Sequence, residues 1–235
     1  MSCTLYWSPD SANVVVRTVL EELGVAYQDV LVDRAGGVHS SAAYRAMNPQ
    51  GLLPVLVVPD QDEPLFETAA ILLWLAERHS ALLPVSAASR GRALKWLFYL
   101  SNTLHADLRV LFYSARYVDG ADAIPALRAA MHARVAGHFS LLDAEIARCG
   151  GPWLLGPELS ICDIYLAWCA RWAQIYPQGD TLAREALHGL PQLWSLLSAL
   201  EVRASVQRAC VREEIARRPF TDPVVPQPTR GAVTG

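Results

Sequence analysis

Two short stretches of the chain carry groups that could bind a small ligand with a charge at each end. Pro54 stands directly before the apolar run of residues 55–58, and a proline at the start of a strand can be cis. The backbone N–H and C=O of Leu53 would then face an extended peptide. Glu67 and Thr68 place a carboxylate beside the free N–H groups of a helix start, so one end can hold an ammonium and the other a carboxylate. These residues predict a site for a peptide-like zwitterion, although a tight turn and an ordinary helix cap would use them equally well.

The elements that must position these groups are a turn, two strands and a helix. Residues 48–51, Asn-Pro-Gln-Gly, are typical of a turn. The run of residues 55–58 is short and β-branched, so it predicts a strand rather than a helix. After a polar turn, residues 65–66 predict a second short strand. A helix then extends over residues 67–79, with Thr68 as its cap and apolar side chains at helical spacing.

The chain before these elements predicts a strand, a helix and a second strand. The first strand covers residues 4–7, and the helix covers residues 12–23 and ends at Gly24. Residues 26–32 form the second strand, so the three elements make a βαβ unit with parallel strands. A loop and a short helix at residues 42–47 complete the order β-α-β-α-β-β-α. We therefore predict an α/β domain over residues 1–80.

Beyond residue 80 the strand signals stop. Helical patterns cover residues 89–117, 123–149, 164–175, 191–200 and 202–218. They predict an all-helical domain over residues 89–218, which follows a linker. Ser160 and Asp163 match the Ser/Thr-x-x-acid form of a helix start. Residues 219–235 are rich in proline and predict a mobile tail.

Composition excludes several classes of protein. The chain has 235 residues, of which 52% are hydrophobic and 18% charged, as is typical of a globular protein. A net charge of −3 without a basic block gives no reason to expect nucleic acid as a partner. The five cysteines form no C-x-x-C pair, which favours reduced thiols over a disulfide scaffold or a metal site. With no apparent signal peptide, and an apolar stretch at residues 69–76 too short to span a bilayer, we expect a cytoplasmic protein that uses neither a membrane nor a metal.

Motifs of several common enzyme classes are missing from the sequence. There is no G-x-x-x-x-G-K, no G-x-G-x-x-G and no H-E-x-x-H. The single lysine, Lys95, falls within a predicted helix. The sequence therefore offers almost no lysine for Schiff-base formation or for phosphate binding.

Four motifs occur in a recognisable order along the chain. They are Leu5-Tyr6-Trp7-Ser8-Pro9-Asp10-Ser11, Asn48-Pro49-x-Gly51-x-Leu53-Pro54-Val55-Leu56, Phe66-Glu67-Thr68-Ala69-Ala70-Ile71 and Trp153-Leu154-x-Gly156-x-x-x-Ser160-x-x-Asp163. With an α/β half before a helical half, the chain resembles the cytosolic glutathione transferase family, in its serine-type, bacterial-like form. The resemblance implies a thioredoxin-like glutathione-binding domain over residues 1–80, a helical domain with the second-substrate pocket over residues 89–218, and usually a homodimer.

The resemblance also implies roles for particular residues. Leu53 would pair its backbone with the cysteinyl unit of glutathione, beside a cis Pro54. Glu67 and Thr68 would hold the ammonium and the carboxylate of the γ-glutamyl unit. The matching role of the Ser160 and Asp163 box is structural in the family.

The glycyl carboxylate of glutathione needs a cation or a hydrogen-bond donor. Gln50 from the turn, and His39 and Arg34 from the preceding loop, are the candidates. Serine-type relatives often have a histidine where Gly51 stands, so this corner departs from the family's pattern. His39 could equally be a plain exposed loop histidine.

The chemistry of the family requires a stabilised thiolate. A glutathione thiol resembles a free cysteine with a pKa of about 8.5, and lowering it by about two units needs roughly 2.7 kcal/mol. A hydrogen bond to a charged acceptor is worth about 1.5–3 kcal/mol. Ser11, at the start of the first helix, matches the serine that serine-type members aim at the sulfur. A role as helix cap only is the alternative, and Asn13 is the second candidate donor.

Two neighbours of Ser11 bear on this mechanism. The Asp10 carboxylate would oppose thiolate formation unless it points away or caps the helix. Ala12 and Asn13 stand where the cysteine-type classes have a thiol, which argues against a mixed-disulfide mechanism.

The helical domain would supply the pocket for the second substrate. Candidate lining residues are Tyr113, Arg116, Tyr117 and Trp172, although aromatic residues at helical spacing are equally typical of a helical core. The leading hypothesis is a glutathione transferase that conjugates the thiolate to a small hydrophobic electrophile, with glutathione as co-substrate. The alternatives are a non-catalytic glutathione-binding module and a glutathione-dependent isomerase or dehalogenase on the same fold.

Overall fold

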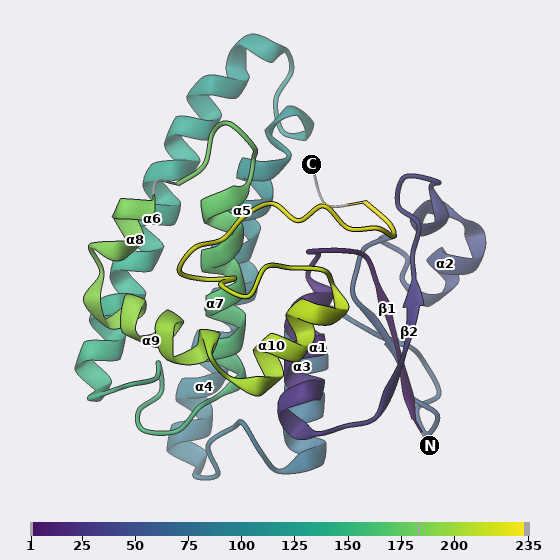
Figure 1. Cartoon of the computed structure of the whole chain (residues 1–235), viewed down its shortest axis with the longest axis horizontal. Helices are drawn as coiled ribbons and strands as arrows, with labels where there is room; N and C mark the ends of the chain where they lie inside the picture. The colour runs from purple at the N-terminus through teal and green to yellow at the C-terminus, as the bar shows by residue number, and fades with distance from the viewer. Residues whose placement is uncertain (1, 183, 233–235) are drawn as a thin grey trace. The chain divides into compact units, whose positions relative to one another are not determined.

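The structure is a computed structural model that describes residues 2–182 and 184–232 (Figure 1). The chain divides into two compact units. The first unit runs to Ala81 and adds Val202–Pro219 and the tail from Val224, and the second unit is Leu82–Glu201 with Phe220–Pro223. The division after Ala81 falls where the sequence changes character. The stretch of residues 202–218, which we assigned to the helical domain, groups instead with the first unit.

The first unit is built on a four-stranded sheet in the order β2-β1-β3-β4. Its strands are β1 (Cys3–Trp7), β2 (Tyr27–Leu31), β3 (Val55–Val57) and β4 (Leu65–Phe66). Its helices are α1 (Asn13–Leu23), α2 (Ala42–Met47), α3 (Thr68–His79) and α10 (Ala204–Arg212), with a 3-10 turn, η1 (Val38–Ser40), before α2. β1 and β2 are parallel, whereas β3 runs antiparallel to both β1 and β4. This confirms the predicted thioredoxin-like order β-α-β-α-β-β-α.

The helix α1 is the core element of the first unit. Its valines and Leu20 are fully buried, and the helix ends where Gly24 adopts a φ of +66°. α3 and α10 both pack against α1 (Figure 1). Ion pairs of Arg203 with Glu22 and of Arg208 with Glu21 join α10 to the last turn of α1. The predicted helix at residues 202–218 is thus shorter, but it has a defined packing partner.

The second unit is helical throughout its described residues apart from connecting segments and the bridge between Trp153 and Gly156. Its helices are α4 (Ala87–Tyr99), α5 (His105–Phe112), α6 (Ile124–Cys149), α7 (Ile161–Ile175), α8 (Arg184–His188) and α9 (Pro191–Glu201). A π-helical turn, η2 (Leu100–Leu104), joins α4 to α5, and short 3-10 turns, η3 (Ser114–Arg116) and η4 (Ala121–Ala123), precede α6. The predicted helical stretch of residues 89–117 is therefore helical from α4 through η2 to the end of α5 at Phe112, with a π-helical turn in its middle, and the 3-10 turn η3 follows. α7 is buried over its whole length, and the all-helical prediction is confirmed.

The start of α7 is a closed capping box. Asp163 accepts hydrogen bonds from the Ser160 N–H (2.8 Å), the Ser160 hydroxyl (2.7 Å) and the Leu154 N–H (2.7 Å). Burial raises the pKa of Asp163 to about 6, although these three donors favour its charged form. Every polar group of the box has a partner within the second unit. The structural role expected for this pair is confirmed.

The described part of the tail has definite contacts. Phe220 is fully buried, and Thr221 donates from its N–H (2.9 Å) and hydroxyl (2.6 Å) to Glu201 in the second unit. Further along, the Thr229 hydroxyl donates to Glu214 (2.7 Å) in the first unit. We expected a mobile tail, and its described residues are instead tied to the chain. None of the described helices is both long and apolar enough to cross a membrane.

Candidate active site

The turn before β3 is held from the interior of the first unit. The carbonyl of Leu52 accepts hydrogen bonds from the Tyr44 hydroxyl (2.8 Å) and from Asn48 Nδ2 (2.9 Å). Both donor residues are buried, and Tyr44 belongs to the apolar cluster under α2 with Val55. The turn therefore has its shape without any help from a ligand.

The peptide bond that follows this turn, between Leu53 and Pro54, is cis, as the sequence suggested it could be. Sheet pairing of β3 begins only at Val55, which lies opposite Tyr6 on β1 and Phe66 on β4. The backbone of Leu53 thus lies beyond the end of the strand ladder. Extended peptides pair with backbone groups in such positions.

The structure brings Gln50, Glu67 and Thr68 together. Gln50 Nε2 donates to the Glu67 carboxylate over 3.0 Å, and Glu67 is exposed at the N-cap position of α3 with a φ of +69°. We expected Thr68 to be the cap, but it is the first helical residue instead. The first hydrogen bond of the helix runs from the Ile71 N–H to the Glu67 carbonyl, so the N–H groups of residues 68–70 lie outside the helical ladder. A carboxylate and a helix N-terminus therefore lie side by side, as required for a zwitterion.

The loop with His39 touches the same turn. At Gly51, which has a φ of +65°, a Cβ atom would stand only 2.7 Å from the His39 carbonyl oxygen. Any side chain at this position would therefore meet that carbonyl. His39 Nδ1 is buried without a hydrogen-bond partner in the described part of the chain. Arg34 lies farther back in the loop, where its carbonyl accepts from the Gly37 N–H (3.1 Å).

Ser11 lies in the turn between β1 and α1 and is half-buried. Its carbonyl accepts the N–H of Val14 (2.9 Å) at the helix start, but Ala12 holds the N-cap position and no side chain caps the helix. Among the described residues, nothing hydrogen-bonds to the Ser11 hydroxyl. Its side chain therefore has no capping role, and its oxygen can donate to a ligand.

The Asn13 side chain lies in the interior and is hydrogen-bonded there. It is fully buried, its Oδ1 accepts the N–H of Ser8 (3.0 Å), and its Nδ2 donates to Glu213 (2.8 Å). Because both ends of the amide serve the turn, the second candidate donor is held away from any ligand. Asp10, also buried, has a φ of +50° and donates its N–H to Glu213 (3.0 Å).

Glu213 is the residue near the site that we did not foresee. It is fully buried at the end of α10, where its Oε1 also accepts from Arg17 Nε (2.9 Å). Burial raises the pKa of Glu213 to about 7, whereas the charge of Arg17 acts to lower it. The signal in the sequence was indirect, because Asn13 and Arg17 are polar positions on an otherwise apolar helix face. Buried polar side chains of this kind require a partner.

The candidates for the second substrate divide into two groups. Tyr113, Arg116 and Tyr117 gather at the end of α5, and the Arg116 guanidinium lies 4.4 Å from the centre of the Tyr113 ring. Trp172 is 3% exposed and stacks on His105 at a centroid distance of 5.2 Å. The first three are near the surface of the second unit, and Trp172 belongs to its interior.

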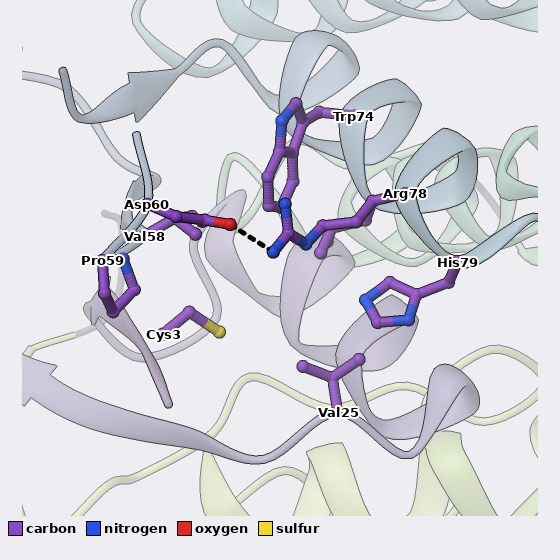
Figure 2. Close-up of a pocket in the computed structure, with 9 residues that line it drawn as sticks. Cys3, Val25, Val58, Pro59, Asp60, Trp74, Arg78 and His79 are labelled. Atoms are coloured by element: carbon purple, nitrogen blue, oxygen red, sulfur yellow. Dashed lines mark hydrogen bonds and ion pairs between the residues drawn. The ribbon is translucent and has the colours of Figure 1, made fainter. Parts of the chain in front are cut away.

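A cavity of about 390 Å³ lies elsewhere in the first unit, and Figure 2 shows the side chains around it. It adjoins Cys3, at the end of β1 opposite the Ser11 turn, and the last turns of α3. Arg78 stacks over Trp74 and pairs with Asp60 (2.5 Å) at its rim (Figure 2). None of the predicted site residues lines this cavity, so it is separate from the candidate site.

Comparisons with known proteins agree with this geometry. Residues 14–78 match the family model of the glutathione S-transferase N-terminal domain. The chain is 33% identical over 167 residues to glutathione S-transferase GstB of Escherichia coli K12, covering 70% of this chain and 79% of that protein. It is 27% identical over 213 residues to GstA of Escherichia coli O157:H7, covering 89% of this chain and 98% of the relative.

Solved structures show the same likeness. A glutathione transferase homologue from Sulfitobacter with bound glutathione superposes with a TM-score of 0.77 at 27% identity, over 91% of this chain and 98% of that one. A glutathione transferase from Burkholderia graminis with two glutathione molecules per subunit gives a TM-score of 0.78 at 26% identity, over 88% of this chain and 87% of that one. On the evidence of its sequence relatives, its fold and the residues gathered around cis Pro54, the chain belongs to the glutathione S-transferase family.

Proposed function

We propose that this protein conjugates glutathione to a small hydrophobic electrophile, with Ser11 donating a hydrogen bond to the glutathione thiolate. The observation that carries the proposal is the Ser11 hydroxyl, which is half-buried at a helix start and has no partner among the described residues. A hydrogen bond to the thiolate contributes about 1.5–3 kcal/mol, and the helix N-terminus contributes about 0.3–1 kcal/mol more. Together these cover the roughly 2.7 kcal/mol that a pKa shift of two units requires.

The other residues of the site would bind and orient the tripeptide. Glu67, supported by Gln50, would hold the ammonium of the γ-glutamyl unit, and Thr68 with the free N–H groups of α3 would hold its carboxylate. The backbone of Leu53 would pair with the cysteinyl unit beside Pro54. These contacts would fix the sulfur without altering its reactivity.

The glycyl carboxylate would lie near the contact between the His39 loop and the turn at Gly51. We assign His39 to it, because the two segments meet there and His39 Nδ1 lacks a partner within the described chain, whereas the Gln50 amide already donates to Glu67. This assignment accommodates the glycine at position 51 without the histidine that many relatives place there.

In the reaction, the thiol proton leaves to solvent and the sulfur forms a bond to an electrophilic carbon. The leaving group departs with its electron pair, or, in an addition, the electrophile takes up a proton. Tyr113, Arg116 and Tyr117 are the residues that we propose for the electrophile pocket. Trp172 would join them only if neighbouring side chains moved, because it is 3% exposed.

Two spectroscopic and kinetic measurements on the full chain test the proposal. The thiolate absorbance of bound glutathione, followed against pH, should give a thiol pKa about two units below that of free glutathione. Turnover should be measured with a generic aromatic halide, an isomerisable double bond and a haloalkane. Tight binding with an unshifted thiol and no turnover would contradict the proposal and indicate a binding module. Turnover of only the isomerisable or the haloalkane substrate would indicate the same glutathione site with a different reaction, that of an isomerase or a dehalogenase.

We also propose that the chain forms a homodimer in the cytoplasm, as its family resemblance implies. All five cysteines are free thiols, which persist in a reducing compartment. Sedimentation equilibrium of the full chain should give twice the mass of 25.8 kDa. A single species of monomer mass across the concentration range of the assay would contradict the dimer.

A further inference from the structure

We propose that Glu213 is a positioning residue for Ser11, and the inference rests on the function proposed above. Glu213 lies 202 residues after Ser11 in the sequence, yet within the first unit its carboxylate holds the turn that carries Ser11. It does not touch glutathione in this proposal. It acts by fixing the backbone from which the Ser11 hydroxyl projects.

The hydrogen bonds of Glu213 lie on both sides of Ser11. Oε2 accepts the Asp10 N–H over 3.0 Å, one residue before Ser11. Oε1 accepts Asn13 Nδ2 over 2.8 Å, two residues after it. Asn13 in turn accepts the N–H of Ser8, so the turn is closed on a single carboxylate. Ser11 and Ala12 lie between the two attachment points, and the Ser11 hydroxyl takes no part in these hydrogen bonds.

The turn needs such a support because of its backbone conformation. Asp10 has a φ of +50°, which is uncommon for a residue with a side chain, and its N–H is turned into the protein, where the residue is 2% exposed. A buried N–H requires an acceptor, and Glu213 supplies it. Without that acceptor, the turn would favour a backbone conformation in which the Asp10 N–H reaches solvent.

Glu213 shares a buried cation with Asp29 in the first unit. Arg17, fully buried, donates its Nε to Glu213 (2.9 Å) and its Nη1 to Asp29 (2.7 Å). Arg17 therefore offsets the negative charge that Glu213 carries when ionised, whereas burial and the neighbouring Asp10 oppose that ionisation. The packing of α10 on α1 brings the carboxylate to this place.

The test is Glu213→Gln in the full chain, with Glu22→Gln as the matched control. A glutamine replaces one acceptor oxygen with a donor, so it cannot accept from Asp10, Asn13 and Arg17 together. Glu22 joins the same two segments, through Arg203 and Ser205, but does not touch the turn. Both variants lose a carboxylate between α1 and the α10 segment.

We expect E213Q to lower kcat about tenfold, since small displacements of a reacting group are costly, while glutathione affinity stays within about twofold. The pKa of the bound thiol should rise by about one unit, and amide hydrogen exchange over residues 8–13 should accelerate. E22Q should leave kcat, the thiol pKa and exchange in this turn at their wild-type values. Equal effects of the two variants, or an E213Q thiol pKa and exchange rate like those of the wild type, would overturn the proposal.

A second variant covers the case in which E213Q does not fold. Glu213→Asp keeps the charge beside Arg17 but is shorter by one methylene, so it should lower kcat and raise the thiol pKa in the same direction. Wild-type kinetics in a folded E213D would overturn the proposal. An inactive wild-type chain with an unshifted thiol would instead refute the proposed function itself, which separates the two failures.

Discussion

Two serines at helix starts, one in each unit, have opposite surroundings. The Ser160 hydroxyl is 2% exposed and bonded to Asp163, within a box in which every polar group is paired. The Ser11 hydroxyl is half-buried and has no partner in the described chain, although the turn around it is held by Glu213. A satisfied hydroxyl can only stabilise the fold, whereas an unsatisfied one on a supported turn can serve a ligand.

Two histidines repeat this contrast. His105 in the second unit is bonded to the Tyr165 hydroxyl (2.8 Å) and stacked on Trp172. His39 in the first unit has a buried Nδ1 without a partner in the part of the chain that the structure describes. The second unit uses these polar groups for its own stability, whereas the corresponding groups of the first unit lack a partner in the described chain and are the ones that we propose for a ligand.

The largest effect should follow from breaking the capping box. Asp163→Ala would leave the N–H groups of Leu154 and Ser160 buried without acceptors, so we expect the free energy of unfolding to fall by about 3 kcal/mol. Denaturant titration of the variant and the wild type measures this difference in the free energy of unfolding. Turnover per folded molecule should be unaltered, and a loss of kcat in the folded variant would show that the box also serves the reaction.

Next in size is the loss of the charge at the start of α3. Glu67→Ala should raise the Kd for glutathione at least tenfold, because a charge-assisted hydrogen bond to the ammonium contributes about 1.5–3 kcal/mol. Calorimetric titration measures the affinity. Glu63→Ala removes the same charge from an exposed position in the turn between β3 and β4 and should bind normally. Equal affinities in the two variants would exclude Glu67 from the site.

The two serines can be compared directly. Ser11→Ala should lower kcat about tenfold with little change in glutathione Kd, because the bond is to the thiolate. Its free energy of unfolding should stay within about 0.5 kcal/mol of the wild type. Ser160→Ala should show the reverse, with stability reduced by about 1 kcal/mol and an unaltered kcat. A normal rate for S11A would remove Ser11 from the chemistry.

The pH also affects the stability of the second unit, through His105. Burial lowers the pKa of His105 to about 4, with the charge of Arg109 acting in the same direction, while an unfolded histidine titrates at about 6.5. Between these values the unfolded chain binds a proton that the folded chain does not. The contribution of His105 is therefore fully present above about pH 6.5 and is lost as the pH falls towards about 4, by up to about 3 kcal/mol.

Denaturant titrations of the wild type and His105→Gln across this range isolate that contribution. As the pH falls from about 6.5 towards about 4, the wild type should lose stability relative to His105→Gln. A difference that stays constant with pH would show that His105 does not titrate between the folded and unfolded states.

Much of the local structure around the candidate site could be predicted because its signals are local. Pro54 at a strand start, the glycine in the turn before it, and Glu67 beside a helix start all act through their immediate neighbours. The same holds for Ser160 and Asp163, three residues apart. The N-cap of α3 is Glu67 rather than the predicted Thr68, because several residues at a helix start can occupy the cap position.

The sequence by itself determined the order of strands and helices, the cis-proline turn and the capping box, because each depends on residues within one turn or one strand pair. Only the tertiary structure decided that Asn13 is bound internally, that His39 meets Gly51, and that α10 belongs with the first unit. Those outcomes depend on contacts such as Asp10 with Glu213, 203 residues apart. A polar residue on a helix reveals that it needs a partner, but the partner is chosen by how distant segments pack.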